Sequence, residues 1–324
     1  MDRLTDTDLA ELRALCKGGL MLDVDLSAIS WWRIGGRADV LLRPSSTKEV
    51  ASLRRWFCAR QIRPVVIGQM TNLLFDDAGL RVPCIQISQK MAAINITGTV
   101  VRAQAGAWVP GLARKLMQAE LGGAEHICGI PGTLGGLICM NGGSQRKGIG
   151  DNVLAVESVD KFGETKLLNV SDCGFDYRKS LFQTNEEIIT SVSMCFQKRP
   201  RASIRSEMRA ILADRSSKFP RKEPNCGSVF KSNPAMYSEI GPPGAIIERL
   251  GFKGKRVGGA MVSPRHANFI VNTGGAKACD VLALISEIDE ATRVSTGHQM
   301  EAEVCFVSAQ GEITPANIVG IGIQ

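Results

Sequence analysis

The sequence lacks the residues and runs that mark several large classes of protein. It has only three histidines and neither an HExxH motif nor a CxxC pair, so we expect no metal. No apolar run approaches the roughly 20 residues that cross a bilayer. The first residues, MDRLTDTDLAEL, are acidic where a signal peptide would be basic and then apolar. We therefore expect a cytoplasmic protein that does not bind a membrane.

The two best-known nucleotide-binding motifs are also missing. No Gly-Lys-Ser/Thr follows a Gly-rich turn, and no GxGxxG is present, which excludes the P-loop and the dinucleotide fingerprint. The ten cysteines are scattered singly, so we expect most of them to be small buried side chains and not disulfides.

A net charge of +7 could indicate a protein that binds nucleic acid, because residues 198–222 concentrate much of the basic charge. Within them Ile204, Met208, Ile211 and Leu212 recur at helical spacing, which predicts an amphipathic helix docked by one face. Aromatic residues do not interleave with the basic ones, as a single-strand binder would require. We expect no nucleic-acid partner, and interpret the charge as a solvated face or as suited to an anionic small-molecule substrate.

With 324 residues, 44% of them hydrophobic, the chain is long enough for two or three domains. A helix is predicted over 5–16, and Ser46 to Glu49 form a capping box that opens a second helix between strands at 38–43 and 64–67. A second strand-then-helix unit starts at Val100 and ends at Gly122-Gly123. We divide the chain into residues 1–95, 96–199 and 200–307, with a C-terminal tail over 308–324.

The most informative segment runs from Cys128 to Ser144 and reads CGIPGTLGGLICMNGGS. Its glycines allow backbone N–H groups to approach a ligand closely or to adopt positive φ, which suits a phosphate-bearing cofactor. Tight turns at a sheet edge are the alternative. A second loop, Gly68 to Asn72, lies between two apolar runs and offers consecutive amides to a pyrophosphate.

Taken in order, these motifs resemble the UDP-N-acetylenolpyruvoylglucosamine reductases of peptidoglycan synthesis, and the resemblance covers most of the chain from about Ile34 to Val307. It is carried by segments 34–38, 68–72, 129–143, 176–180, 224–230, 254–259, 266–269 and 300–304. The stretch GGSQRKGIGDN holds no tyrosine, so the chain resembles the shorter branch of the family, which lacks a tyrosine-bearing lid. The resemblance implies an α+β protein with a FAD-binding fold of the vanillyl-alcohol-oxidase/PCMH type and a C-terminal α+β substrate domain.

The resemblance also implies a non-covalent FAD, held jointly by residues 1–95 and 96–199, and NADPH as hydride donor. The residues implied in cofactor binding are Gly68, Gln69, Met70, Thr71, Asn72, Gly129, Ile130, Pro131, Gly132, Thr133, Gly135, Gly136 and Asn141. The implied reaction reduces the enolpyruvyl ether of UDP-N-acetylenolpyruvoylglucosamine to UDP-N-acetylmuramate. The implied partner is a UDP-sugar substrate, and no obligate protein partner is evident.

Three residues match the family's catalytic positions. Arg178 would stabilise charge that develops on the substrate carboxylate, as a preorganised guanidinium does. Ser228 would donate a proton from its hydroxyl, and Glu303 would polarise the enolic intermediate with Arg178. Tyr177 and Lys231 are implied in substrate binding. From the residues alone, strand-capping, turn and surface roles remain open for the three.

The sequence departs from the family pattern in four places. Trp31-Trp32-Arg33 crowds a position where relatives have a small threonine, and Met140 to Ser144 replace a Met-Asn-Ala-Gly-Ala run. Met70 stands where a second glycine is usual, and its Cβ demands negative φ or a strain of roughly 1 kcal/mol. Cys305 replaces an arginine that is common in the family, which removes a cation from the substrate side of the proposed site.

Because of these departures three functions are carried forward. They are the cell-wall reductase itself, a paralogous FAD enzyme that acts on a related nucleotide sugar in specialised or surface-polysaccharide metabolism, and a flavin-binding protein without turnover. Cys226 is assigned no role, because no histidine is close in sequence to activate it.

Overall fold

The computed structural model describes residues 4–232 and 234–319, which form two compact units. Of these residues, the first unit takes 4–22, 40–69 and 83–215, and the second takes 23–39, 70–82 and 216–319. This grouping differs from the division predicted from sequence, because segments 23–39 and 70–82 belong with the C-terminal part of the chain. The separation of the first unit into two halves at about residue 95 stays a prediction.

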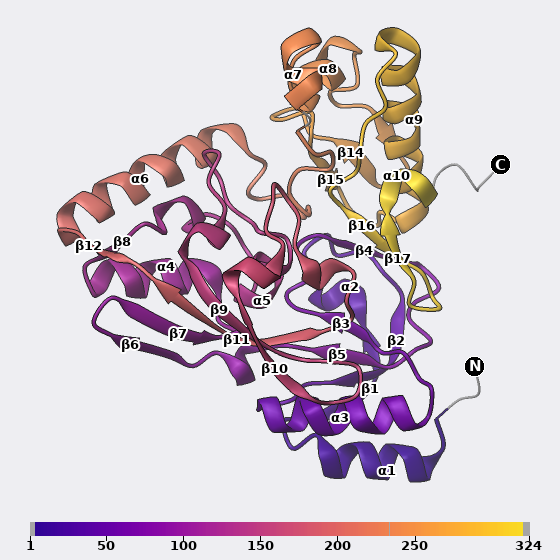
Figure 1. The fold of residues 1–324 in the computed structure, drawn as a ribbon. Helices are drawn as coiled ribbons and strands as arrows, with labels where there is room; N and C mark the ends of the chain where they lie inside the picture. The colour runs from indigo at the N-terminus through magenta and orange to yellow at the C-terminus, as the bar shows by residue number, and fades with distance from the viewer. Residues whose placement is uncertain (1–3, 233, 320–324) are drawn as a thin grey trace. The chain divides into compact units, whose positions relative to one another are not determined.

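A five-stranded antiparallel sheet, in the order β10-β9-β11-β7-β6, is the centre of the first unit (Figure 1). Its strands alternate between faces: Val101 and Ala103 of β7 are fully buried, whereas Arg102 between them is exposed. The buried face contacts α5, and the core continues into α4. The bounds are β6 Ile94–Thr97, β7 Val100–Gln104, α4 Val109–Gln118, β8 Leu121–Gly122, α5 Leu134–Cys139, β9 Val153–Val159, β10 Thr165–Asn169, β11 Ile188–Cys195, β12 Gln197–Lys198 and α6 Arg201–Lys218.

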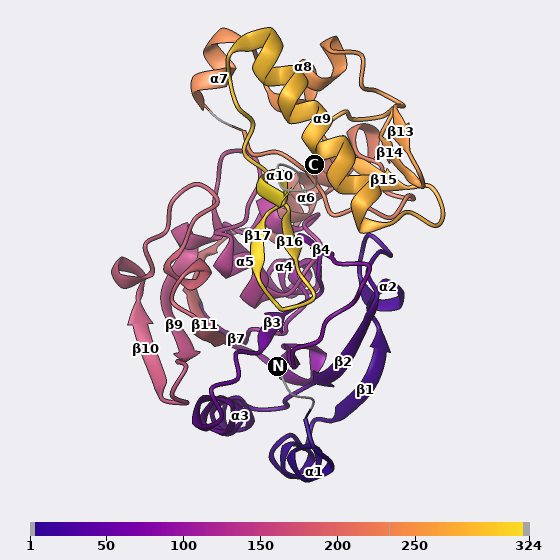
Figure 2. The same ribbon diagram turned by 90° about the vertical axis from the view of Figure 1, so that its right-hand side faces the viewer.

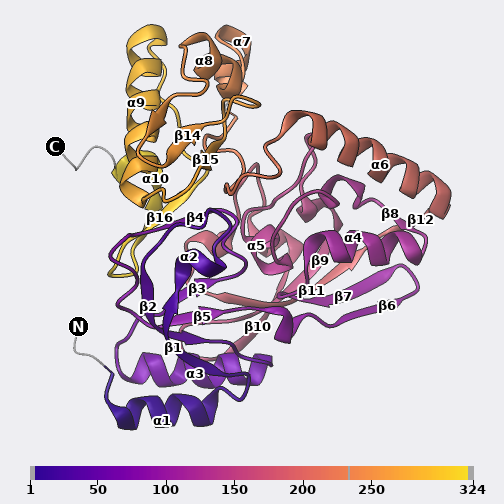
Figure 3. The same ribbon diagram turned by 180° about the vertical axis from the view of Figure 1, so that it is seen from behind.

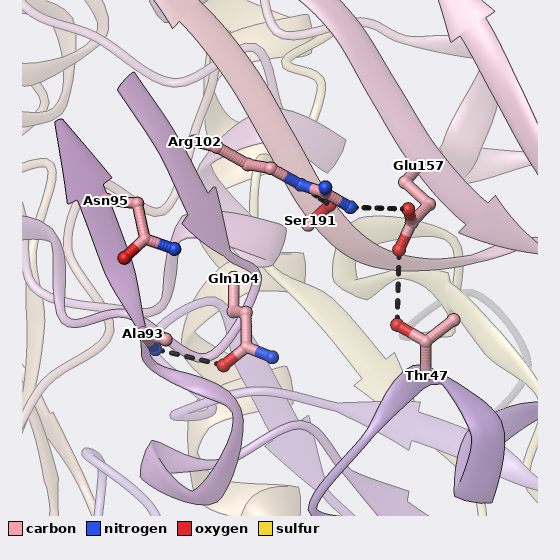
Figure 4. Close-up of a pocket in the computed structure, with 7 residues that line it drawn as sticks. All are labelled: Thr47, Ala93, Asn95, Arg102, Gln104, Glu157 and Ser191. Carbon is pink, nitrogen blue, oxygen red and sulfur yellow. Dashed lines mark hydrogen bonds and ion pairs between the residues drawn. The ribbon is translucent and has the colours of Figure 1, made fainter. Parts of the chain in front are cut away.

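A smaller sheet, in the order β1-β2-β5-β3, accompanies helices α1 and α3, which contact each other (Figure 3). Ser46 accepts from the amide of Glu49, as a capping box requires. The reciprocal bond is not made, because the Glu49 carboxylate accepts instead from the amides of Ser45 and Gly18. The bounds are α1 Asp6–Leu15, β1 Leu20–Asp25, β2 Arg37–Leu42, α3 Thr47–Ala59, β3 Val65–Ile67 and β5 Cys84–Gln86.

The second unit contains two three-stranded sheets (Figure 2). Helix α9 packs on β13-β14-β15 and buries Val281, Leu284, Ile285 and Ile288 on one face. In the other sheet β16 pairs in parallel with β4, with Cys305 opposite Leu73. The bounds are α2 Leu26–Ile29, β4 Leu73–Phe75, α7 Pro234–Glu239, α8 Pro243–Arg249, β13 Arg256–Val257, β14 Ala260–Val262, β15 Ile270–Asn272, α9 Ala278–Thr296, β16 Cys305–Val307, β17 Ile313–Pro315 and α10 Ala316–Val319.

Most predicted elements are present, and one predicted helix boundary is wrong. Helix α4 ends at Gln118 and not at Gly122-Gly123, because Leu121–Gly122 pairs with β12 as a short strand. The C-terminal tail over 308–324 stays a prediction, and its described residues form β17, which pairs with β16, and α10. All ten cysteines are free, as expected, but Cys58, Cys195 and Cys279 are exposed.

Two further predictions concern single features. The basic segment forms α6 with Ile204 and Ile211 buried, which confirms the amphipathic helix. None of the described helices is both long and apolar enough to cross a membrane.

Candidate active site

The glycines of the Cys128–Ser144 run are explained mainly by close packing inside the first unit. A Cβ on Gly129 would lie 2.7 Å from the Arg215 side chain, and one on Gly143 would lie 1.8 Å from the carbonyl of Lys147. Gly132 has a φ of +131°. The run is therefore compact for reasons internal to the protein.

Gly136 is the exception among these glycines. It is exposed, and the nearest atom to its ideal Cβ is the Thr133 hydroxyl at 3.5 Å, an ordinary contact. Thr133 itself is buried and caps α5 by accepting from the Gly136 amide at 3.4 Å. The fold does not require a glycine at 136, so we interpret its missing side chain as room for a ligand.

The loop at 68–72 is shaped for the same kind of ligand. The backbone N–H groups of residues 68–71 donate no hydrogen bond to any described residue. Consecutive amides without a protein acceptor are the donors that a phosphate needs. Gly68 is required at the start of the loop, because its Cβ would lie 2.4 Å from the Thr133 hydroxyl.

Met70 adopts the strained conformation that the sequence made possible. Its φ is +54°, in the left-handed region, while its side chain is 3% exposed. The Cβ of a non-glycine residue costs about 1–2 kcal/mol there. Burial of the side chain offsets this cost.

Arg178 lies at the tip of a tight hairpin in the first unit. Asp176 and Lys179 exchange two backbone hydrogen bonds, each 3.1 Å long, with Tyr177 and Arg178 between them. Arg178 has a φ of +54°, and its Nη2 donates to the carbonyl of Gly143 at 3.2 Å. Its guanidinium also lies 5.4 Å from the Tyr177 ring centroid, within the range of a cation–π contact.

Ser228 and Glu303 are brought together in the second unit by backbone pairing. The amide of Glu303 donates to the carbonyl of Val229 at 2.7 Å, one residue after Ser228. Phe230 and Ala302 form the antiparallel bridge that continues this pairing. Gly227 before Ser228 has a φ of +80°. The Ser228 hydroxyl makes no hydrogen bond to the described residues and is partly exposed.

Lys231 and Cys305 flank this segment. The Lys231 amine pairs with the Glu301 carboxylate. Burial is the main cause that raises the pKa of the Cys305 thiol, with a smaller opposing effect of Lys231. Cys305 is therefore a neutral group beside a cation that Lys231 supplies.

Cys226 is buried with its thiol directed at the carbonyls of Met70 and Leu73, at 3.5 and 3.6 Å. Burial raises the pKa of this thiol to about 12, so it is not a thiolate at neutral pH. Trp32 is also a core residue, since its indole donates to the carbonyl of Ile270 at 2.9 Å, whereas Trp31 is exposed.

The sequence also matches known families. Residues 38–169 match a family model described as FAD binding domain, and residues 219–307 match one described as UDP-N-acetylenolpyruvoylglucosamine reductase, C-terminal domain. UDP-N-acetylenolpyruvoylglucosamine reductase 1 of Corynebacterium glutamicum is 43% identical over 297 residues, which cover 92% of this chain and 89% of that protein. The chain belongs to the UDP-N-acetylenolpyruvoylglucosamine reductase family.

Other relatives agree. The reductase of Shouchella clausii is 33% identical and covers 90% of this chain and 92% of its own. The crystal structure of the reductase from Thermus caldophilus aligns with a TM-score of 0.76 at 29% identity, and covers 89% of this chain and 99% of that one. These findings confirm the predicted family, the α+β FAD-binding fold and the FAD cofactor.

The structure places some of the predicted site residues on neighbouring segments, whereas the roles of the others stay predictions. Ser228 and Glu303 lie on paired segments of one unit, and Asn72 joins them by donating to the carbonyl of Glu303 at 2.8 Å. Arg178 belongs to the other unit, so its action beside Ser228 and Glu303 stays a prediction. Cofactor contacts of the thirteen proposed residues also stay predictions.

Two residues that support the site were missed from sequence. Gln86, 7% exposed, donates to the carbonyl of Gly68 at 3.1 Å and accepts from Arg43 at 2.7 Å. Asn268, 5% exposed, accepts from the amide of Phe230 and donates to its carbonyl, both at 2.9 Å. The signal for Asn268 was its place in the His-Ala-Asn-Phe motif, whereas Gln86 carries no such signal.

Proposed function

We propose that this protein reduces the enolpyruvyl ether of UDP-N-acetylenolpyruvoylglucosamine to UDP-N-acetylmuramate, with NADPH as the electron donor, in cytoplasmic peptidoglycan synthesis. The observation that carries the proposal is the 43% identity to a reductase of this name across 92% of the chain. The four unpartnered amides at 68–71 and the open Gly136 fit the bound FAD that such a reaction needs.

The reaction adds a hydride to the β-carbon of the enolpyruvyl group and a proton to the adjacent carbon, and NADPH is oxidised to NADP⁺. FAD, which the loop at 68–72 and the open Gly136 would hold, would supply the hydride-transfer chemistry between NADPH and the substrate. Negative charge develops on the substrate carboxylate as the hydride arrives. The guanidinium of Arg178 would stabilise that charge, and removal of such a donor costs on the order of 3 kcal/mol.

The proton would come from the hydroxyl of Ser228, which is partly exposed and makes no hydrogen bond to the described residues. A free hydroxyl can turn toward a substrate carbon without first breaking a bond in the protein. Glu303, held by the backbone of Val229, would polarise the enolic intermediate together with Arg178. Tyr177 and Lys231 would bind the anionic substrate.

One residue favours a second candidate, a paralogous enzyme acting on a related nucleotide sugar. Cys305 replaces a residue that is commonly arginine, and its partly buried thiol, whose pKa is raised, is neutral. Lys231 supplies a cation close to the same place, which favours the first function. The two differ in substrate, so one assay separates them.

The test is NADPH oxidation by the purified, yellow holoprotein with and without UDP-N-acetylenolpyruvoylglucosamine. We expect oxidation to depend on this compound, and oxidation only with another nucleotide sugar would support the paralogue. The substitutions R178A, S228A and E303A should each retain FAD and lose turnover. Loss of FAD in these variants would show that the three residues are structural.

A further inference from the structure

The last part of the Gly-rich run is hydrogen-bonded to the hairpin that carries Arg178. Three hydrogen bonds join segment 139–143, which begins at the last residue of α5, to segment 176–180. The Asn141 amide donates to the carbonyl of Asp176 at 2.9 Å, and Arg178 donates to the carbonyl of Gly143 at 3.2 Å. Ser180 donates to the carbonyl of Cys139 at 2.6 Å.

Asn141 is the central member of this contact, because both ends of its side-chain amide are used. Its Oδ1 accepts from the amide of Gly150 at 2.9 Å while its Nδ2 holds Asp176. Gly148 and Gly150 leave the space for it, since a Cβ on either would lie 2.7 or 2.9 Å from Oδ1. The polar groups of this side chain are thus directed at protein backbone.

The carbonyl of Asp176 matters because it also closes the hairpin. It accepts from the amide of Lys179 at 3.1 Å, so Asn141 and Lys179 share one acceptor. Arg178, between Asp176 and Lys179, has a strained φ of +54°. A strained backbone persists only where the surrounding contacts hold it.

We propose that Asn141 is a positioning residue for Arg178 and not a ligand of the cofactor. By fixing Asp176, Asn141 holds the hairpin in the conformation that presents the Arg178 guanidinium. This rests on the proposed role of Arg178, and it gives Asn141 a different role from the cofactor binding that the resemblance implies.

The test is a double-mutant cycle on the holoenzyme with N141A, R178A and the double variant. We expect N141A to retain FAD and an unchanged KM for NADPH, and to lower kcat about tenfold, the effect of one hydrogen bond of about 1.4 kcal/mol. In the R178A background, N141A should cost nothing more, because the residue it positions is gone. Equal losses in both backgrounds would overturn the proposal.

A second measurement does not depend on activity. Hydrogen exchange of the Lys179 amide should accelerate in N141A and in N141D, which keeps the acceptor for Gly150 but loses the donor to Asp176. The matched control is N152A, because Asn152 donates to the carbonyl of Cys195 at 3.3 Å in the same unit. N152A should leave exchange at Lys179 and kcat unchanged.

These readouts separate the possible failures. If R178A retains full turnover while N141A still accelerates exchange at Lys179, the role of Arg178 is wrong and the structural contact is right. If N141A loses FAD or leaves exchange at Lys179 unchanged, Asn141 does not position the hairpin.

Discussion

The side chain of Asn72 donates a hydrogen bond to the backbone carbonyl of Glu303, which is 231 residues away in the chain. The bond joins the end of the proposed pyrophosphate loop to a proposed catalytic residue. We expect N72A to lower the free energy of unfolding by about 1 kcal/mol. Urea denaturation measures this, with T71A as the matched control, because the Thr71 side chain makes no hydrogen bond to the described residues. Equal midpoints for N72A and T71A would contradict the expectation.

At Met70, backbone strain lowers the stability of the protein and side-chain burial raises it, so their magnitudes decide the effect of a substitution. Replacement by glycine would relieve about 1–2 kcal/mol of left-handed strain. It would lose a side chain that is 3% exposed, and truncation of a buried methionine costs about 2–5 kcal/mol. The added freedom of the unfolded chain costs up to about 1 kcal/mol more. We therefore expect M70G to be less stable than the parent protein in denaturant, and an increase in stability would show that strain dominates.

A substitution at Gly136 distinguishes what the fold requires at this position from what FAD binding requires. A Cβ at this exposed site in the first turn of α5 meets only an ordinary contact, and alanine favours the helix by up to about 1 kcal/mol. We expect G136A, stripped of FAD, to be at least as stable as the parent protein and to bind FAD more weakly. Fluorescence titration with FAD and apoprotein melting measure the two quantities.

Two outcomes would contradict the interpretation of Gly136. Unchanged FAD affinity would show that the cofactor does not approach this residue, and a destabilised apoprotein would show that the fold itself needs the glycine. G143A is the contrasting variant, because its Cβ would lie 1.8 Å from a backbone carbonyl. It should destabilise the protein with or without FAD.

His126 makes stability depend on pH. It is 3% exposed, neither ring nitrogen has a hydrogen-bond partner among the described residues, and burial, aided by Lys147, lowers its pKa despite Asp151 and Glu125. The unfolded chain then binds more protons than the folded one below about pH 6.5, so stability is highest above that pH and falls as the pH drops.

Two substitutions test this contribution. H126F and H126Q should both flatten the loss of stability between about pH 7 and pH 5.5, because neither side chain titrates there. H126F alone should raise stability at neutral pH, since it removes an unsatisfied buried polar group. Urea midpoints across this range give the slopes, and a slope unchanged in both variants would exclude His126 as its source.

The cysteines should differ in reactivity according to burial. A thiol reagent that absorbs on release should titrate the exposed Cys58, Cys195 and Cys279 in the native protein and leave Cys226 untouched until the protein unfolds. The pKa of Cys226, raised to about 12, and its burial both oppose reaction. C226S should therefore leave the native titration unchanged. A lost fast-reacting thiol in C226S would refute this.

The features predicted best from the sequence are those formed by residues that lie close together in the chain. Helix α3 was predicted because its start signal, Ser46 to Glu49, lies within four consecutive positions, and the helix begins at Thr47 with Ser46 as its cap. The Gly-rich run was recognised, but the reason for Gly129 was not, because Arg215 approaches it from another part of the chain. The contacts of Asn141 with Gly150 and Asp176 were not predicted either, since these partners leave no local pattern in the sequence.

The division of the chain into two units also left no signal in the sequence. Pairing of β4 with β16 assigns residues 70–82 to the C-terminal unit, and a parallel pair carries no hairpin signal between its strands. Ser228 and Glu303 could be chosen only by resemblance, because each alone is an ordinary turn or strand residue.

The parallel pairing of β4 with β16 has a consequence for biosynthesis. On the ribosome, β4 emerges early and must wait while some 230 further residues are translated before its partner exists. The first unit ends at Arg215 and can reach its native contacts while translation continues. The second unit, with Ser228 and Glu303, is therefore completed only after residues 305–307 have been translated, and a premature stop before residue 305 would leave β4 of that unit without its partner strand.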